Sequence, residues 1–470
     1  MIKDTVMALF LTILSAALAT AANYNGDLYF LTWTALLPFL YYLFIYKNQE
    51  LTYKSIFLKG WNLGFWILVF TANFLYNSIK LYTEAPFLII ILILFLLFLL
   101  LSLIYGLFFV LYLFLQKKLF AQNGFRALLF AAVWTLMELS RYYLLSFFPI
   151  ANPAYTQANF FSFIQLVEFG GIWILTFILI LVNGLLFQLI FEKKYKNIFI
   201  LSIIFFMIFG TGFFLQEREF KAGREEAKAL EIGIITTQIE QEKKWKAEQL
   251  SENIELTLNA ASKLNQTQLI IAPETNITFD FYNNHNYKDQ FLEKVESDFE
   301  APIQIGALAS KNPDRGRYNS VFLLSDTGEI ISRYDKNLLL YFGETYPFLE
   351  LLNEYTEYSF SSLNPGKELT VFKFGELRWR TVICSEILYP SYVKKAARDV
   401  DFIVNQTNEA WFKNNKLLKN IMWQAAVLRA VENRVPIIKT GNQAHSGIIY
   451  PGGSFKKVDP EKNYHILNLK

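Results

Sequence analysis

The single cysteine of the chain, Cys384, is the first residue that could carry chemistry. One cysteine cannot form a disulfide within the chain, and the sequence holds no Cys and His cluster suited to structural zinc. The thiol is therefore either a small buried side chain or a nucleophile. The preceding run, residues 381–383, is β-branched throughout, which favours a strand. We expect Cys384 where that strand ends and a turn begins, a position at which folds expose reactive atoms.

Two other predicted strand ends carry a carboxylate and an ammonium group. Glu274 follows the apolar run 270–272, and Lys336 follows the second arm of a hairpin predicted around residues 326–328. Taken singly, such residues are usually solvated surface groups. Together with Cys384 they supply a base, a cation for an oxyanion and a nucleophile, which is a complete set for acyl transfer.

A cysteine nucleophile needs a base, because the thiolate is the reactive form and an ordinary thiol has a pKa of about 8.5. The three histidines of the chain, His285, His445 and His465, do not stand in convincing strand-end positions. Glu274 is therefore the predicted base.

The region that must position these groups alternates short apolar runs with polar helical stretches, which is typical of a layered α/β domain. Strands are predicted over residues 230–239, 268–272, 302–309, 320–325, 329–333, 369–374, 378–383 and 401–405. Helices are predicted over residues 240–264, 287–299, 390–399 and 416–433.

The first half of the chain is typical of a membrane domain. Hydrophobic residues make up 53% of the chain and charged residues only 18%, and charge is scarcest before residue 216. About seven apolar runs approach the roughly 20 residues that span a bilayer: 5–22, 29–46, 57–77, 86–115, 127–147, 164–191 and 197–215. We therefore predict a transmembrane domain of about seven helices over 1–215, a charged linker over 216–229, and a catalytic domain over 230–470.

The loops between these runs predict the orientation of the chain. Basic residues gather in the second, fourth and sixth connections: Lys47, Lys54, Lys117, Lys118, Arg126, Lys193, Lys194 and Lys196. Because loops rich in Lys and Arg stay in the cytoplasm, we expect a cytoplasmic N-terminus. An odd number of spans then places the catalytic domain outside the cytoplasm. The net charge of +3 indicates no nucleic-acid partner.

Two polar features within the membrane half could also be functional. Glu138 and Arg141 are three residues apart on one predicted helix, so they form either a structural ion pair or a contact to a lipid head group. Tyr155, Gln157 and the turn at 152–153 follow in an outer loop, and we expect them to face a substrate that arrives from the lipid.

The ordered motifs resemble those of a known family. They comprise residues 273–274, 334–336, 342–347, 383–386, 405–412 and 429–434. The set is similar to the Glu-Lys-Cys triad and its surroundings in the nitrilase superfamily. Behind several membrane spans it resembles the membrane-embedded branch of that superfamily, the apolipoprotein N-acyltransferase family.

The resemblance implies an αββα sandwich outside the bacterial inner membrane, with Glu274, Lys336 and Cys384 as catalytic residues. It implies transfer of a fatty acyl chain from a phospholipid to the α-amine of an S-diacylglyceryl-cysteine lipoprotein, through a thioester on the cysteine. The expected partners are those two lipid substrates and membrane lipids. No metal or organic cofactor is implied, and we expect a monomer.

Five further residues match positions around the family's site: Glu344, Glu386, Trp245, Asn319 and Trp411. The resemblance implies that Glu344 orients Lys336 and the base; otherwise it is a surface turn residue. Glu386 follows the nucleophile closely enough to shape the site. The other three are either pocket residues or ordinary core and turn residues.

Two other functions remain open. The same triad could serve a membrane-tethered carbon–nitrogen hydrolase that uses water on a small amide. The third hypothesis is a catalytically silent scaffold or lipid-binding protein. The three intact triad positions argue against it.

The chain departs from the family pattern in one respect. The family typically ends with an eighth span, and no apolar run of that length follows residue 230.

Overall fold

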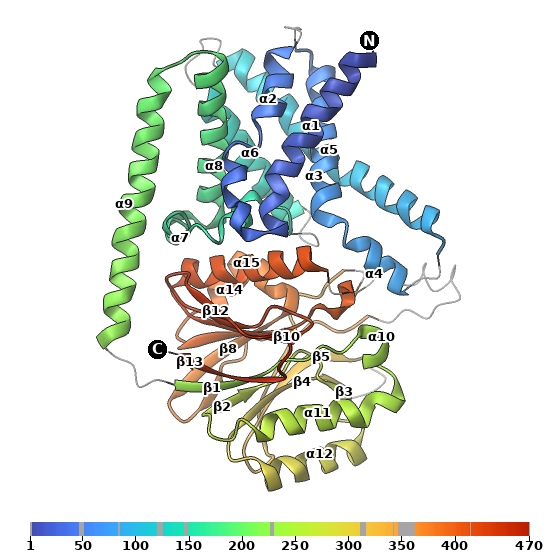
Figure 1. Ribbon diagram of the computed structural model, residues 1–470. Coiled ribbons are helices and arrows are strands. Elements are labelled where there is room, and N and C mark those ends of the chain that lie inside the picture. Colours follow the sequence, from blue (N-terminus) through green and yellow to red (C-terminus); the bar gives the residue numbers. More distant parts are fainter. Residues whose placement is uncertain are drawn as a thin grey trace. The chain divides into compact units, whose positions relative to one another are not determined.

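The computed structural model describes residues 2–46, 51–82, 85–119, 126–144, 149–225, 230–310, 316–341, 343–345, 362–413 and 415–469 (Figure 1). Contacts between Cα atoms divide the chain into two compact units. The first comprises Met1–Arg218 and Asn415–Glu432, and the second comprises Glu219–Asn414 and Asn433–Lys470.

In the described residues, the first unit contains helices and connecting turns and no strand. Its elements are α1 (Ile2–Tyr24), η1 (Gly26–Trp33), α2 (Leu37–Phe44), α3 (Tyr53–Ala72), α4 (Leu75–Tyr82), α5 (Phe87–Leu119), α6 (Arg126–Leu144), η3 (Pro153–Gln157), α7 (Phe161–Ile164), α8 (Val167–Phe191), α9 (Lys196–Glu225) and α15 (Lys416–Asn433). Among the described residues, six segments are long and apolar enough to cross a membrane: Lys3–Tyr24, Gly26–Phe44, Tyr53–Ala72, Phe87–Lys118, Val167–Phe191 and Lys196–Leu215.

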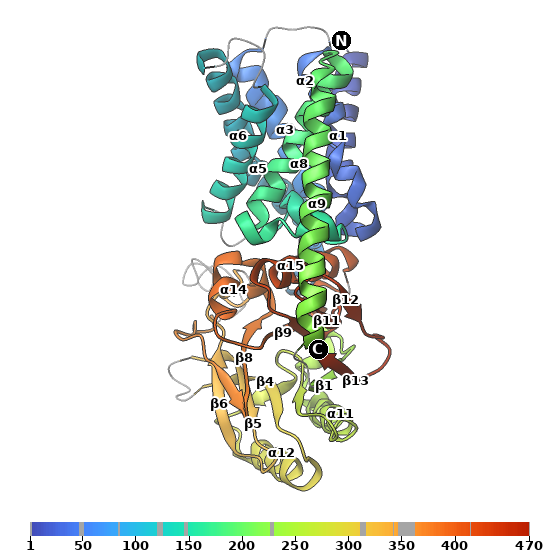
Figure 2. The ribbon, with the colours of Figure 1, turned by 90° about the vertical axis from the view of Figure 1, so that its left-hand side faces the viewer.

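Two segments differ from the sequence pattern. Helix α6, which matches the run predicted over 127–147, carries Glu138 and Arg141 and is not among the six apolar segments. Helix α9 continues to Glu225, through much of the segment predicted as a linker, and Figure 2 shows it as one long helix. Residues 226–229 lie outside the described residues.

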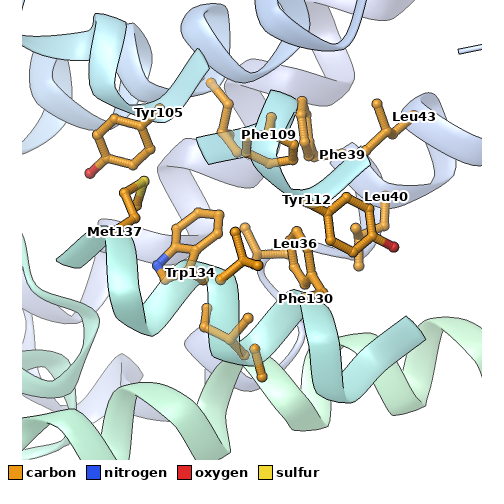
Figure 3. Packing of buried hydrophobic residues seen from close by; sticks show 14 of the residues in the cluster. Leu36, Phe39, Leu40, Leu43, Tyr105, Phe109, Tyr112, Phe130, Trp134 and Met137 are labelled. Atoms are coloured by element: carbon orange, nitrogen blue, oxygen red, sulfur yellow. The ribbon is translucent and has the colours of Figure 1, made fainter. Parts of the chain in front are cut away.

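Small residues let α3 and α5 approach closely in the core of this unit. A Cβ atom at Gly60 would lie 2.5 Å from the ring of Phe109, and one at Gly64 would lie 2.5 Å from the ring of Tyr105. Both pairs repeat every four residues, so each set occupies one helix face. Figure 3 shows the two rings beside Trp134 in the buried cluster. Such contacts replace the hydrophobic driving force that helices lack within lipid.

The Glu138–Arg141 pair is buried inside the first unit. Nη2 of Arg141 lies 2.5 Å from Oε2 of Glu138, and Nη1 donates to the backbone carbonyl of Ile150 at 2.6 Å. These contacts favour the structural ion pair over a head-group contact, because both side chains bind protein groups and are almost fully buried.

The prediction that Tyr155 and Gln157 face a lipid-borne substrate is wrong. Both side chains are buried in the first unit. Gln157 accepts a hydrogen bond from Nε1 of Trp33 at 2.9 Å and donates to the carbonyl of Tyr29 at 3.1 Å. The loop therefore folds inward, since its polar side chains satisfy backbone and indole groups of η1.

Helix α15 is grouped with the first unit although it is distant from it in sequence. Its boundaries match the predicted helix at 416–433. Asn420 donates to the carbonyls of Asn23 and Tyr24, both at 3.0 Å, and Gln424 donates to the carbonyl of Ala22 at 2.8 Å. The last carbonyls of a helix have no partner within it. The two amide side chains therefore cap the end of α1.

The second unit contains two sheets. The strands are β1 (Leu230–Ile235), β2 (Leu269–Ile271), β3 (Ile277–Asp280), β4 (Ile303–Ala309), β5 (Tyr318–Leu324), β6 (Ile330–Asp335), β7 (Phe372–Phe374), β8 (Leu377–Ile383), β9 (Phe402–Asn408), β10 (Ile437–Asn442), β11 (Gly447–Ile449), β12 (Phe455–Lys457) and β13 (Tyr464–Leu469). The first sheet has the order β13-β1-β2-β4-β5-β6 with β3 beside β4, and the second has the order β12-β11-β10-β9-β8-β7.

The two sheets face one another through buried polar side chains. Gln304 of β4 donates to Thr381 of β8 at 3.0 Å and accepts from the indole of Trp379 at 2.6 Å. Helices α11 (Leu250–Ser262) and α12 (His285–Asp298) cover the outer face of the first sheet (Figure 1). Helix α14 (Pro390–Ala396) packs on the second sheet. The predicted αββα sandwich is confirmed.

Several elements differ from the predicted ones. The sequence pattern did not predict β3 or the strands from β10 onward. The long helix predicted over 240–264 is divided into α10 (Gln241–Lys244), the short turn η4 (Ala247–Gln249) and α11. At this division the last residue of α10, Lys244, is buried in the interior.

Candidate active site

Three strand ends of the second unit bring the predicted reactive side chains together. Glu274 follows β2, Lys336 follows β6 and Cys384 follows β8, and all three are buried. Strand β2 and the last three residues of β8 are short apolar or β-branched runs that are fully buried, so the turns after them are fixed in place. Rigid strand ends hold side chains more precisely than long loops do.

The ammonium group of Lys336 lies between two carboxylates. Its Nζ is 2.6 Å from Oε2 of Glu344 and 3.9 Å from Oε1 of Glu274. The amide of Asn319 joins the same two carboxylates, since Nδ2 lies 2.7 Å from Glu274 and 2.8 Å from Glu344. The predicted residues Glu344 and Asn319 therefore belong to this cluster, and Glu344 is not a free surface residue.

The second carboxylate oxygen of Glu274 is also held. Oε2 accepts a hydrogen bond from the backbone N–H of Asn408 at 2.6 Å. One oxygen thus faces Asn319 and Lys336, and the other faces the end of β9. Because every partner is fixed by a strand end, the carboxylate has little freedom to rotate.

Cys384 begins the 3-10 turn η6 (Cys384–Leu388) and has a left-handed backbone with φ of 51°. Non-glycine residues in that region are strained and often mark functional turns. Asn405 donates to the carbonyls of Val382 and Cys384 at 3.0 and 3.3 Å, which holds the turn. The hydroxyl of Thr407 lies 3.3 Å from Sγ.

Burial dominates the electrostatics of the three reactive groups. It raises the pKa of Cys384 to about 12, with Glu274 adding to the rise and Lys336 opposing it. It also raises the pKa of Glu274 above its ordinary value of 4.5, while Lys336 lowers it. Burial alone would lower the pKa of Lys336, but Glu344 and Glu274 outweigh it and raise the pKa. Burial therefore favours the neutral forms of Cys384 and Glu274, while the two carboxylates favour the charged form of Lys336.

Glu386 connects the turn that carries the lysine to the turn that carries the cysteine. Oε1 accepts from the backbone N–H groups of Asn337 and Leu338 at 2.8 and 3.0 Å. Oε2 accepts from the N–H of Ile383 and from the hydroxyl of Tyr334, both at 2.7 Å. The side chain is completely buried, and its hydrogen bonds hold the two turns together.

The two predicted tryptophans lie around this cluster at different depths. Nε1 of Trp411 is 3.1 Å from the side-chain amide of Asn408, whose backbone holds Glu274. Trp245 is 39% exposed and lines a surface hollow of ≈ 500 Å³ with residues that include Leu250 and Phe279. Trp411 therefore joins the hydrogen-bonded surroundings of Glu274, and Trp245 is available to a ligand at the surface.

Sequence reasoning missed several residues of the site. Thr407 and Glu409 lie within the motif at residues 405–412, but the sequence pattern predicts no role for them. Glu409 forms a buried ion pair with Lys439, with Nζ 2.8 Å from Oε1. Lys244 is also buried and contacts the turn of Glu274. Among the described residues, no group of three or more His, Cys, Asp or Glu side chains is arranged for a metal ion.

Comparison with known families matches both halves of the chain. Residues 15–185 match the apolipoprotein N-acyltransferase N-terminal domain, and residues 233–461 match the carbon-nitrogen hydrolase domain. The chain belongs to the apolipoprotein N-acyltransferase family of the nitrilase superfamily. The family predicted from the motifs is thus confirmed, and the protein is an acyltransferase.

Two relatives among known proteins agree with this assignment. An apolipoprotein N-acyltransferase of Geobacter metallireducens is 28% identical over 359 residues, which cover 72% of this chain and 67% of the relative. One of Aquifex aeolicus is 28% identical over 450 residues, which cover 92% of this chain and 94% of the relative. Among solved structures, an amidase from Nesterenkonia sp. matches 51% of this chain and 90% of its own, with 16% identity and a TM-score of 0.38.

Proposed function

We propose that this apolipoprotein N-acyltransferase family member transfers a fatty acyl chain from a phospholipid to the N-terminal α-amine of S-diacylglyceryl-cysteine lipoproteins. The acyl group passes through a thioester on Cys384. The observation that carries this proposal is the buried cluster in which Lys336 lies within 3.9 Å of Glu274, in a chain whose two halves both match the family.

The first half-reaction acylates the cysteine. Glu274 takes the thiol proton as Sγ of Cys384 attacks the ester carbonyl of the phospholipid. Lys336, together with a backbone N–H beside Cys384, stabilises the oxyanion of the tetrahedral intermediate. The ester C–O bond then breaks, and Glu274 returns the proton to the departing lysophospholipid alcohol. The raised pKa of Glu274 suits both directions of this transfer.

The second half-reaction transfers the acyl group to nitrogen. Glu274 accepts a proton from the α-amine of the lipoprotein as the amine attacks the thioester carbonyl. The C–S bond breaks, and the sulfur recovers a proton from Glu274. The same three groups serve both steps, which gives ping-pong kinetics.

The supporting residues act through the reactive ones. Glu344 and Asn319 fix the distance between the Lys336 ammonium and the Glu274 carboxylate. Glu386 keeps the turns of Lys336 and Cys384 together. None of the three needs to touch the acyl group.

The membrane location explains the choice of acceptor. The protein is a multi-pass bacterial membrane protein. We infer that residues 1–215 form its transmembrane domain and that residues 230–470 form a catalytic domain on the periplasmic side of the inner membrane. We also infer that the protein acts as a monomer. A site open to lipid excludes water from the thioester and concentrates both lipid substrates. An amine delivered on a lipid anchor then reacts before water does.

Mass spectrometry of the full chain in phospholipid micelles tests the proposal. Wild type is compared with Cys384→Ala, with and without a diacylglyceryl-cysteine peptide. An acyl-sized mass on wild type alone, which moves to the peptide amine, supports acyl transfer. If folded wild type forms no adduct and leaves the peptide unmodified, the proposal is wrong, and hydrolysis of small amides would then point to the carbon–nitrogen hydrolase reaction.

A further inference from the structure

Lys244 is a buried lysine that the mechanism above does not use. It ends α10 and is 1% exposed, whereas its neighbours Lys243 and Lys246 are exposed. Lysine is rarely buried without a partner, because removing its charge from water is costly. A lysine in this position therefore needs a set of acceptors.

Three acceptors surround its ammonium group. Nζ lies 3.1 Å from the backbone carbonyl of Glu274 and 3.0 Å from Oγ1 of Thr275. It also lies 3.3 Å from the side-chain amide of Asn408, which accepts this bond when its oxygen faces the lysine. An ammonium group has three donors, so this arrangement satisfies all of them. Two of the three partners belong to the turn that carries the base, and the third belongs to the residue whose N–H holds the base.

The local structure explains why Lys244 points inward. Gln241 lies three residues earlier, so it shares a face with Lys244, and its amide is 3.0 Å from that of Asn408. Asn253 donates to the carbonyl of Lys244 at 3.2 Å, which fixes the end of α10 against α11. The inward face of this short helix therefore contacts both the turn that carries Glu274 and the residue whose N–H binds it, Asn408.

The turn after Glu274 is tightly constrained. Thr275 has a positive φ of 45°, which is unfavourable for a β-branched residue. On the side of β4, a Cβ atom at Gly306 would lie 2.5 Å from the backbone nitrogen of Thr275. Lys244 therefore binds a strained turn that already packs against backbone.

Charge balance gives Lys244 a second role. Glu274 and Glu344 bring two carboxylates into the cluster, and Lys336 supplies one cation, at 2.6 Å from Glu344. Lys244 supplies another. When the thiol proton moves to Glu274, the negative charge moves to sulfur, and the net charge of the cluster is unchanged. Both cations thus act on the carboxylate before the transfer and on the thiolate after it.

We propose that Lys244 is a positioning residue of the acylation step, which fixes the turn that carries Glu274 and supplies the second positive charge of the buried cluster. This inference rests on the proposed function, in which Glu274 is the base. Burial lowers the pKa of Lys244 to about 8, while Glu274 and Cys384 oppose the shift. Those two are the titratable groups that act on it, and burial makes its charge sensitive to mildly alkaline pH.

The test compares three variants of the full chain in phospholipid micelles. Lys244→Met keeps the length of the side chain and removes the charge, and Lys244→Arg keeps the charge. Lys243→Met is the matched control, because that neighbouring lysine is exposed and pairs with the exposed Glu240. The first readout is the rate at which Cys384 is acylated in single turnover without an acceptor amine. The second is the rate of its alkylation by iodoacetamide between pH 5 and 10, which needs no lipid substrate.

We expect Lys244→Met to acylate Cys384 about 10- to 100-fold more slowly. In its pH–rate profile, the acidic range in which acylation slows should move to higher pH, because Lys244 favours the ionised form of Glu274. Any fall in the wild-type rate above about pH 8 should be absent from this variant. Lys244→Arg should recover part of the rate, and Lys243→Met should match wild type.

The outcomes separate this inference from the proposed function. If wild type is acylated and Lys244→Met keeps its rate and pH profile, the role of Lys244 is overturned while the function stands. If wild type is not acylated, the alkylation profiles still decide, since identical profiles for wild type and Lys244→Met overturn the role. Should Lys244→Met fail to fold, Thr275→Val removes one acceptor at nearly constant shape, and a wild-type acylation rate and alkylation profile for it would overturn the positioning role.

Discussion

The hydroxyl of Thr407 lies 3.3 Å from Sγ of Cys384. The same hydroxyl is 3.5 Å from Oε1 of Glu409, and its one proton can be donated to only one of these atoms at a time. While sulfur is protonated, the hydroxyl can face the carboxylate. Once the thiolate forms, donation to sulfur is the stronger interaction, because the acceptor is charged. Thr407 therefore contributes to thiolate stability through a rotation of its own hydroxyl.

Thr407→Val should slow acylation of Cys384 about 10- to 100-fold, because a hydrogen bond to a charged group contributes about 1.5–3 kcal/mol. Thr407→Ser should stay within a few-fold of wild type, since it keeps the hydroxyl. Single-turnover acylation followed by mass spectrometry measures both. Equal rates for the valine and serine variants would rule out a role for the hydroxyl.

Glu344→Gln should reduce acylation by about 100-fold and lower thermal stability. The change leaves Lys336 buried without its nearest carboxylate, and breaking a buried pair from one side costs about 3–5 kcal/mol. Unfolding of the detergent-solubilised protein gives the stability, and the acylation assay gives the rate. Glu240→Gln removes an exposed partner of Lys243 and should change neither quantity. A stable and active Glu344→Gln would show that Lys336 needs only Glu274.

As the pH is lowered, the acylation rate should fall at a pH higher than that at which an ordinary glutamate titrates. Burial raises the pKa of Glu274 above 4.5, so the base is already protonated, and inactive, at a pH where exposed carboxylates are still charged. The rate should therefore rise with pH and reach half its maximum above pH 4.5. The measurement uses single turnover without the acceptor amine, because that amine titrates as well. A midpoint below 4.5 would exclude Glu274 as the base.

Glu386→Gln should lower both stability and activity. An amide offers one acceptor oxygen, so it cannot serve the donors that Glu386 now binds through both oxygens, and each unsatisfied buried donor costs about 1–3 kcal/mol. Chemical denaturation of the full chain in detergent measures the loss. Glu376→Gln, at an exposed turn before β8, is the matched control and should resemble wild type. Wild-type stability of Glu386→Gln would show that the two turns hold their positions without this carboxylate.

Gly64→Ala should destabilise the first unit, because the added Cβ would lie 2.5 Å from the ring of Tyr105. Gly210→Ala in α9 is a close control, since a Cβ there meets no atom within 4 Å. The control should be neutral or slightly more stable, as alanine favours helices more than glycine does. Melting temperatures in the same detergent compare the two. Equal temperatures would show that α3 and α5 can move apart at little cost.

The sequence predicted the parts of the site that depend on local pattern. Residues 381–383 and 270–272 are short apolar or β-branched runs, so their strands and the turns after them could be located without a structure. The turn residues at 326–328 likewise predict the hairpin before Lys336. In the structure, Gly328 takes the positive φ that this turn requires. Strand ends then converge in a layered fold, which explains why the reactive residues were found.

The remaining parts depend on distant contacts that local pattern does not encode. Lys244 stands in a charged stretch that is typical of an exposed helix, yet the turn of Glu274 and the side chain of Asn408 contact it in the interior. The sequence pattern around Gln157 predicts an exposed loop residue. Its side chain is nevertheless buried, because it accepts a hydrogen bond from Trp33, which is far away in the sequence. Polar residues that are buried by partners from another part of the chain give no local signal.

The capping of α1 by α15 has a consequence for how the protein is made. The carbonyls of Ala22, Asn23 and Tyr24 receive their hydrogen bonds from Asn420 and Gln424, which the ribosome adds some four hundred residues later. Proteins generally fold from the N-terminus as they are synthesised. Here the first membrane helix emerges early, but the unit to which it belongs is complete only after most of the α/β sandwich has been translated. Insertion into the bilayer and final packing of the helices are therefore separated in time.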